Sequence, residues 1–195
     1  MKISTLTFKD YKQLSNTDKE YVMSNINCLK AMLKNNGLSN DRYLHSLSVA
    51  KVCKNLAKAH NYDENKAYLA GLLHDACKTK NIELSRSLLI KYEPDKLNYS
   101  EKVYHSWACK YFLIEMLDFA DFDVLNAIYN HTILTSKDTL SLILYIADKR
   151  EPLRGIKDDI LKVAKKDLNL AYETLETDVQ KYLKSKNERF IKNCL

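Results

Sequence analysis

Four of the five histidines in this sequence stand beside apolar residues at helical spacing, and one of them is followed directly by an aspartate, at His74 and Asp75. This pair comes after Leu72 and Leu73, so burying it places an imidazole and a carboxylate where both need strong polar partners. A neutral imidazole can bind one metal ion, and a carboxylate can share its two oxygens between two. The pair is therefore suited to a dinuclear metal site.

Further candidate ligands of the same two types are spread along the chain, at His45, His105, His131 and Asp148. Nitrogen and oxygen ligands together suit iron, manganese, cobalt, nickel or zinc, whereas magnesium and calcium prefer oxygen alone. Taken singly, each histidine is more typical of a satisfied core residue, and Asp148 is equally typical of a helix end. His60 is predicted to lie on the surface.

Long helices are the elements expected to position these side chains. The sequence has only three glycines and two prolines, too few for a β-sandwich or barrel with many turns. Apolar residues spaced by three or four predict a first helix through Val22, Ile26, Leu29 and Leu33 that stops at Gly37. A second helix begins near Asn40 or Asp41, and its face carries His45, Val49, Val52 and Leu56.

The remaining candidate ligands fall on later helices or at their ends. A third helix starts around Asp63 and ends at His74 and Asp75. Its small residues Ala67, Ala70 and Gly71 allow another helix backbone to approach closely. His105 and His131 each join an apolar stripe on further helices, and Asp148 ends the run Leu140, Ile143, Leu144, Ala147. Pro152 and Gly155 mark a break before a final amphipathic helix with Leu161, Leu168, Leu175 and Val179.

Length and composition predict one all-α domain over residues 1–195, a single helical bundle, and the candidate ligands would place a metal site between its helices. Five cysteines (Cys28, Cys53, Cys77, Cys109, Cys194) without a C-x-x-C pair indicate neither a disulfide framework nor a cysteine zinc site. Residues 1–10 lack the apolar run of a signal peptide, and no apolar stretch is long enough to span a bilayer. We therefore expect a cytoplasmic protein. The net charge of +6 fits either attraction to phosphates or a well-solvated surface.

The motifs R-Y-L-H-S-L-S-V-A (42–50), A-G-L-L-H-D-A-C-K (70–78), His105, N-H-T (130–132) and Y-I-A-D (145–148) occur in an order that resembles the HD-domain phosphohydrolases. More narrowly, the sequence is similar to the bacterial symmetrical diadenosine-tetraphosphate hydrolases of that superfamily. The resemblance spans about residues 42–155. It implies a small helical enzyme with a dinuclear metal centre, and iron is the metal it favours.

Carried over residue by residue, the resemblance implies that His45, His74, Asp75 and Asp148 hold one metal. It implies that Asp75, His105 and His131 hold the second, with Asp75 as the bridge. It also places Arg42, Lys78 and Arg154 near the substrate phosphates, with Arg42 and Lys78 taking part in catalysis beside Asp75. Guanidinium groups match phosphate oxygens, and a lysine offsets negative charge. As lone residues, each would be typical of a solvated surface.

The activity implied is hydrolysis of diadenosine tetraphosphate to two ADP, with a dinucleoside polyphosphate as substrate and ADP or a GDP-like product as a further ligand. The alternatives are another HD-type nucleotidase, a cyclic-nucleotide phosphodiesterase or alarmone hydrolase, and a non-catalytic helical module that binds nucleotide or RNA through its basic surface and thirteen tyrosines. The ordered ligands argue against the binding module, so we expect neither nucleic acid nor membrane as a partner. The sequence leaves a homodimer open.

The sequence departs from the family pattern in two places. After His131 it reads T-I-L-T-S, without the glycine often found there, and Lys149 and Arg150 replace apolar residues after Asp148. These differences concern contacts to the substrate rather than the metal ligands.

Overall fold

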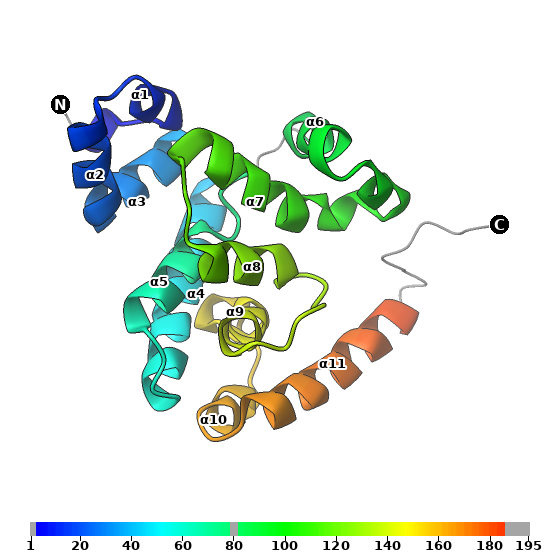
Figure 1. Cartoon of the computed structure of the whole chain (residues 1–195). Coiled ribbons are helices and arrows are strands. Elements are labelled where there is room, and N and C mark those ends of the chain that lie inside the picture. The colour runs from blue at the N-terminus through cyan, green and yellow to red at the C-terminus, as the bar shows by residue number, and fades with distance from the viewer. Residues whose placement is uncertain (1–2, 79–81, 186–195) are drawn as a thin grey trace.

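The structure, a computed structural model, describes residues 3–78 and 82–185, and Cys194 lies outside these ranges. Within them the chain forms α-helices and four short 3-10 helices, and no β-strand occurs among the described residues (Figure 1). The all-α class predicted from the sequence is confirmed. In the part described, no helix is long and apolar enough to cross a membrane.

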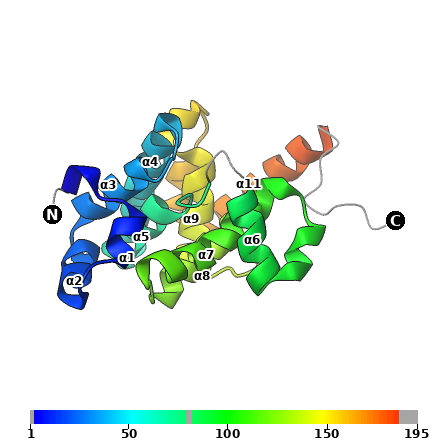
Figure 2. The same ribbon diagram turned by 90° about the horizontal axis from the view of Figure 1, so that it is seen from above.

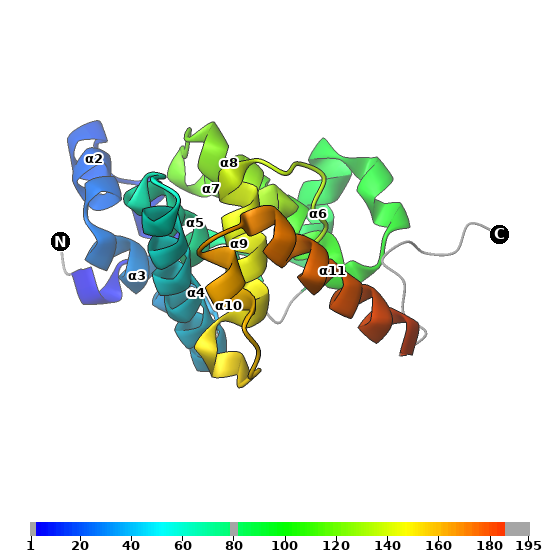
Figure 3. The same ribbon diagram turned by 90° about the horizontal axis from the view of Figure 1, so that it is seen from below.

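Five helices surround the candidate ligands: α4 (Asn40–Ala59), α5 (Glu64–Leu73), α7 (Tyr104–Leu117), α8 (Phe122–Asn130) and α9 (Thr139–Arg150). Helix α4 packs along α5 and also contacts α9, while α5 contacts α8 and α9 (Figure 3). Helix α7 lies against α8 on the other side of this group (Figure 2). The ligands therefore come from helices that share one packed centre.

Side-chain caps fix where several of these helices begin. The Ser39 side chain accepts a hydrogen bond from Arg42 N and caps α4, directly before the predicted helix start near Asn40 or Asp41. Asp63, around which a helix start was predicted, caps α5, and Asp121 and Asp138 cap α8 and α9 in the same way. An acceptor at this position satisfies backbone N–H groups that have no partner within the helix. Each cap thereby sets the register of the residues that follow.

The two helices on the N-terminal side of α4 differ from the single helix predicted. Asn25 separates α2 (Asn16–Ser24) from α3 (Ile26–Asn35). Its backbone is extended, and its side chain accepts a hydrogen bond from Asn27 N, which caps a new helix. The prediction of one helix was wrong, because the apolar spacing across residues 22–33 continues through this break and does not reveal it.

The predicted final helix is also divided, into α10 (Ile160–Ala164) and α11 (Leu168–Ser185). Asp167 accepts a hydrogen bond from Leu170 N, so it acts at the start of α11 as Asn25 does at α3. The remaining elements are α1 (Phe8–Lys12), α6 (Glu83–Tyr92) and the 3-10 helices η1 (Ile3–Thr5), η2 (Pro94–Asn98), η3 (Glu101–Val103) and η4 (Pro152–Arg154).

Gly71 allows α4 and α5 to approach closely, as the small residues of the third predicted helix indicated. A Cβ added at this position would lie 2.6 Å from the Cα of Ala50 and 2.8 Å from its backbone nitrogen. Both are backbone atoms of α4, which cannot move away without shifting the helix. The separation of His45 on α4 from His74 at the end of α5 therefore depends on a residue without a side chain.

We expect Gly71→Ala to destabilise the protein by about 1–3 kcal/mol, because it overpacks a contact between two backbones. Urea denaturation measures this change. The variant should also bind divalent metal more weakly than the wild type, since pushing α4 from α5 separates His45 from His74.

Gly37→Ala is the matched control. Gly37 has a φ of +83° and open space around it, so its replacement costs backbone strain of about 1–2 kcal/mol without moving α4 against α5. Metal binding should stay at the wild-type level in this control. Wild-type stability in Gly71→Ala would contradict the close packing.

Candidate metal centre

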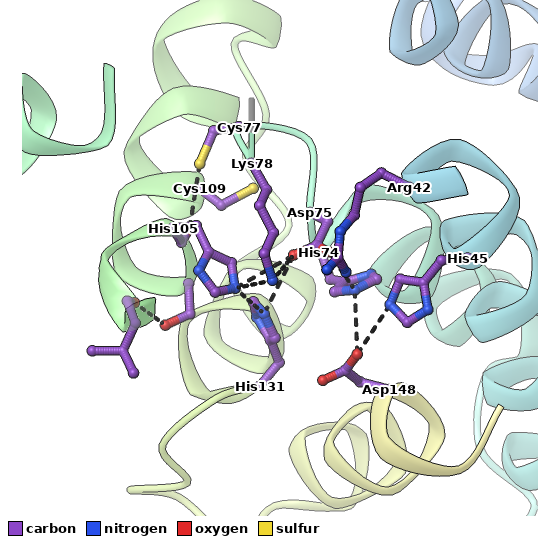
Figure 4. Close-up of polar contacts among 12 residues, drawn as sticks. Arg42, His45, His74, Asp75, Cys77, Lys78, His105, Cys109, His131 and Asp148 are labelled. Atoms are coloured by element: carbon purple, nitrogen blue, oxygen red, sulfur yellow. Dashed lines mark hydrogen bonds and ion pairs between the residues drawn. The ribbon is translucent and has the colours of Figure 1, made fainter. Parts of the chain in front are cut away.

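The six candidate ligands converge on one buried centre, although more than 100 positions separate the first from the last (Figure 4). Each stands at or near a helix end. His45 and His105 lie in the first two turns of α4 and α7, His74 and His131 directly follow α5 and α8, and Asp148 lies in the last turn of α9. The packing of these helices brings the ends together.

The first group of ligands consists of His45, His74 and Asp148. The Nε2 atom of His45 lies 3.1 Å from Oδ1 of Asp148, and the Nε2 atom of His74 lies 3.8 Å from the same oxygen. One atom from each of the three side chains falls within 4.8 Å of the others. The group could hold one metal ion.

Around the other side of the centre, His105 and His131 face Asp75. Their Nε2 atoms are 3.2 Å apart, and they lie 3.4 Å and 3.7 Å from Oδ1 of Asp75. The second oxygen of Asp75, Oδ2, faces the first group and lies 3.5 Å from Nε2 of His74. Asp75 therefore presents one oxygen to each group, which is the arrangement that a bridging carboxylate requires.

Two polar atoms at this centre fit a bound cation. Nε2 of His74 and Oδ1 of Asp75 are buried and have no hydrogen-bond partner. A buried polar atom without a partner costs free energy, and a metal ion between these side chains would satisfy both. The donor set of imidazole nitrogens and carboxylate oxygens suits a transition metal.

The orientation of the imidazole rings supports the same interpretation. Nδ1 of His74 bonds to the carbonyl oxygen of Gly71 at 2.8 Å, and Nδ1 of His131 bonds to that of Ile128. Because a carbonyl only accepts, Nδ1 must carry the proton in both rings. Each Nε2 is then left with a lone pair that faces the centre.

Arg42, Lys78 and Arg154 all reach the centre. Arg42 donates to Oδ2 of Asp75 at 3.0 Å, and the Lys78 ammonium lies 3.1 Å from Nε2 of His105. Arg154 donates to Oδ1 of Asp148 at 2.9 Å and also bonds to the Asp148 carbonyl. Figure 4 shows Arg42 and Lys78 entering from the same side. Three cationic side chains thus border the ligands.

Sequence reasoning missed two residues at the centre, Lys149 and Glu151. Lys149, noted only as a departure from the family pattern, donates to the carbonyl oxygen of His131 at 3.0 Å and lies 3.7 Å from Asp148. Glu151 is buried and lies 3.1 Å from Nδ1 of His45. A glutamate three residues after a ligand, directly before Pro152, was the available signal.

His60, by contrast, lies outside the centre. Its ring is half-buried rather than on the surface as predicted, and Nε2 bonds to the carbonyl oxygen of Ala164 at 2.6 Å. The four described cysteines are free and buried, and Cys77 and Cys109 each donate to a backbone carbonyl. None of these groups is a candidate ligand.

A profile of the HD domain matches residues 42–153, more than half of the chain and the whole stretch from Arg42 to η4. The chain belongs to the HD-domain family. Curated relatives include the symmetrical bis(5'-nucleosyl)-tetraphosphatase of Halalkalibacterium halodurans, which is 32% identical over 77% of this chain and 83% of its own length. That of Staphylococcus aureus is 35% identical over 65% of this chain and 68% of its own length.

A third relative, from Mycoplasma genitalium, is named a probable nicotinate-nucleotide adenylyltransferase/Ap4A hydrolase. It is 36% identical over 80% of this chain, and this chain spans 45% of its length. Among solved structures, a "predicted HD superfamily hydrolase involved in NAD metabolism" from Clostridium acetobutylicum covers 90% of both chains with a TM-score of 0.70 and 28% identity. The chain is thus similar to hydrolases of the HD-domain family, and this family depends on metal.

Burial and charge act in opposite directions on the groups of this HD domain. Burial would raise the pKa of Asp75, but electrostatic interactions with His74, Lys78, His105 and His131 hold that pKa well below its usual value. Burial lowers the pKa of His74 and His131, and it lowers that of His105 to about 3. Three rings are therefore neutral at neutral pH, as metal ligands must be.

His45 and Lys149 complete the electrostatics of the centre. Burial would lower the pKa of His45, but its hydrogen bonds to Asp148 and Glu151 raise it overall. Burial lowers the pKa of Lys149 to about 8, against the opposing charge of Asp148. A metal ion next to Asp148 would take the place of the hydrogen bond between Asp148 and Nε2 of His45.

The lowered pKa of His105 predicts how the stability of the metal-free HD domain responds to acid. Between pH 6.5 and about 3, the unfolded imidazole takes up a proton and the folded one does not. Acidification through this window therefore favours the unfolded state, by up to about 1.4 kcal/mol per pH unit for one such group. His45, with its raised pKa, acts in the opposite direction and is present in every variant compared.

We expect His105→Gln, in chelator, to lose stability less steeply than the wild type as the pH falls through that window. Urea denaturation at several pH values measures the slope. His60→Gln is the control for removing an imidazole outside the centre. Equal slopes in the wild type and His105→Gln would contradict the burial of a neutral ring.

Proposed function

We propose that this chain hydrolyses a nucleotide phosphoanhydride, and that its substrate is diadenosine tetraphosphate, cleaved symmetrically to two ADP. The observation that carries the proposal is the convergence of His45, His74, Asp75, His105, His131 and Asp148 on one buried centre. The names of the relatives from Halalkalibacterium and Staphylococcus support the substrate.

The two carboxylate oxygens of Asp75 divide the ligands into two sets. His45, His74 and Asp148 would hold one ion with Oδ2 of Asp75, and His105 and His131 would hold a second with Oδ1. We propose a dinuclear transition-metal centre. Iron is the favoured metal, and manganese, cobalt, nickel or zinc are the alternatives. Bound metals of this kind make water a nucleophile at neutral pH and offset charge on a phosphate.

The chain's own cations complete the site. Arg42, Lys78 and Arg154 border the ligands, and their charges would bind the phosphates and stabilise the negative charge that grows on the leaving ADP. In the overall reaction, one water molecule adds across the central P–O–P linkage, and the P–O bond to one of the two central phosphates breaks. No covalent bond to the protein forms.

The descriptions of two similar proteins support a second substrate class. The Mycoplasma relative carries an adenylyltransferase activity in its name beside Ap4A hydrolase, and the Clostridium structure is described as involved in NAD metabolism. Another phosphoanhydride, such as a pyridine dinucleotide, could therefore occupy the same centre. A purely binding module is disfavoured, because charge-driven binding does not require buried ligand atoms without partners.

The main test is anaerobic purification with metal analysis, followed by chromatography of the products from diadenosine tetraphosphate, a pyridine dinucleotide and a guanosine alarmone. We expect two metal ions per chain and ADP as the sole product of the first substrate. His74→Ala should lower metal content and reduce kcat/KM by more than about 100-fold, since loss of even an outer partner of a ligand costs 10- to 100-fold.

His60→Ala is the matched control, because its imidazole lies outside the centre. It should retain metal and activity. Full activity in His74→Ala would refute the centre, while metal binding with turnover of another substrate alone would refute only the choice of diadenosine tetraphosphate.

Arg42→Gln tests the role proposed for the cations. A charge-assisted hydrogen bond contributes about 1.5–3 kcal/mol, so kcat/KM should fall about 10- to 100-fold while both metals stay bound. Arg86→Gln, which removes a surface ion pair with Glu101, is the control and should leave kcat/KM unchanged. An unchanged kcat/KM in Arg42→Gln would exclude Arg42 from phosphate binding.

A further inference from the structure

Glu151 is a buried carboxylate that no part of the proposed reaction uses. It follows the last residue of α9, and 2% of its surface is exposed. A glutamate this deeply buried requires hydrogen-bond partners for both oxygens. The partners of Glu151 are what connect it with the centre.

The first oxygen of Glu151 faces a metal ligand. Oε1 lies 3.1 Å from Nδ1 of His45, on the opposite side of the ring from Asp148. An ionised carboxylate only accepts, so this contact places the proton of a neutral His45 ring on Nδ1. Nε2 then carries the lone pair and is directed at the centre.

The second oxygen of Glu151 holds the turn that follows α9. Oε2 accepts a hydrogen bond from Leu153 N at 2.8 Å, which caps the 3-10 helix η4. Arg154 ends this short helix and donates to Asp148. One carboxylate thus connects a ligand on α4 with the segment that presents a cation to the centre.

His45 differs here from two other ligands. Nδ1 of His74 and of His131 bonds to a backbone carbonyl three residues earlier in the chain, which no side-chain substitution can remove. The ring of His45 depends on a side chain more than 100 positions away. Its orientation can therefore be altered by a single substitution outside the ligand set.

We propose that Glu151 is a positioning residue that keeps Nε2 of His45 directed at the metal and fixes the turn that carries Arg154. The inference rests on the proposed metal centre. Groups that orient a ligand in this way typically change metal affinity by 10- to 100-fold. Glu151 is not expected to contact the substrate.

The test compares Glu151→Gln and Glu151→Ala with the wild type in titrations of the chelator-treated protein with Mn²⁺ and Zn²⁺. We expect affinity at one of the two sites to fall about 10- to 100-fold in Glu151→Ala. The loss should be smaller in Glu151→Gln, because an amide oxygen can still accept from Nδ1. Glu93→Gln is the control, since Glu93 accepts hydrogen bonds from Tyr111 and Tyr129 away from the ligands.

A second measurement separates positioning from a merely structural role. Nitrogen NMR of the Zn²⁺-loaded protein should show His45 protonated on Nδ1 in the wild type, with that signal shifted or lost in Glu151→Ala. Urea denaturation of the metal-free proteins reports stability alone. A fall in stability without any change in metal affinity or in the His45 signal would overturn the proposal.

The outcomes distinguish a failure of the proposed metal centre from a failure of the role proposed for Glu151. If the wild type binds neither Mn²⁺ nor Zn²⁺, the metal centre itself fails, and Glu151 with it. If the wild type binds and both variants bind equally tightly, only the role of Glu151 is refuted. Should Glu151→Ala not fold, the isosteric Glu151→Gln supplies the affinity comparison. Protonation of His45 on Nε2 in the Zn²⁺-loaded wild type would refute the role without any variant.

Discussion

A single buried negative charge organises this molecule. Asp75 has 1% of its side chain exposed, and in a low-dielectric interior such a charge is stable only among positive or proton-donating groups. The chain supplies the cations Arg42 and Lys78, and the imidazoles that face the two oxygens of Asp75 leave room for a metal ion between them. The packing of α4, α5, α7 and α8 can be understood as the means of bringing those groups to one carboxylate.

Much of the centre could be predicted from the sequence, because each candidate ligand stands in a local pattern. His45 joins an apolar stripe, and the His74–Asp75 pair follows two leucines. Residue types and helical spacing therefore predict that these side chains face the core. The convergence of these positions rests on helix packing, which the small residue Gly71 indicated for α4 and α5 alone. The order of the motifs supplied the rest by resemblance, and the roles of the individual ligands stay predictions.

The parts that sequence reasoning missed share a physical cause. Apolar spacing continues across Asn25 and across residues 165–167, where a polar side chain caps a new helix, and periodicity alone does not detect a cap inside a continuous stripe. Lys149 and Glu151 were missed for a related reason. Charged residues after a helix are normally solvated, and only the tertiary structure shows that these two turn inward to a carbonyl and an imidazole.

The use of backbone carbonyls to hold His74 and His131 has a consequence for how such a protein can change over generations. Their ring orientation is encoded by the path of the main chain at Gly71 and Ile128, so it survives replacement of almost any neighbouring side chain. These two rings therefore keep their orientation when neighbouring side chains are substituted. The ring of His45 lacks this protection, because its Nδ1 contacts the side chain of Glu151 and not a backbone carbonyl.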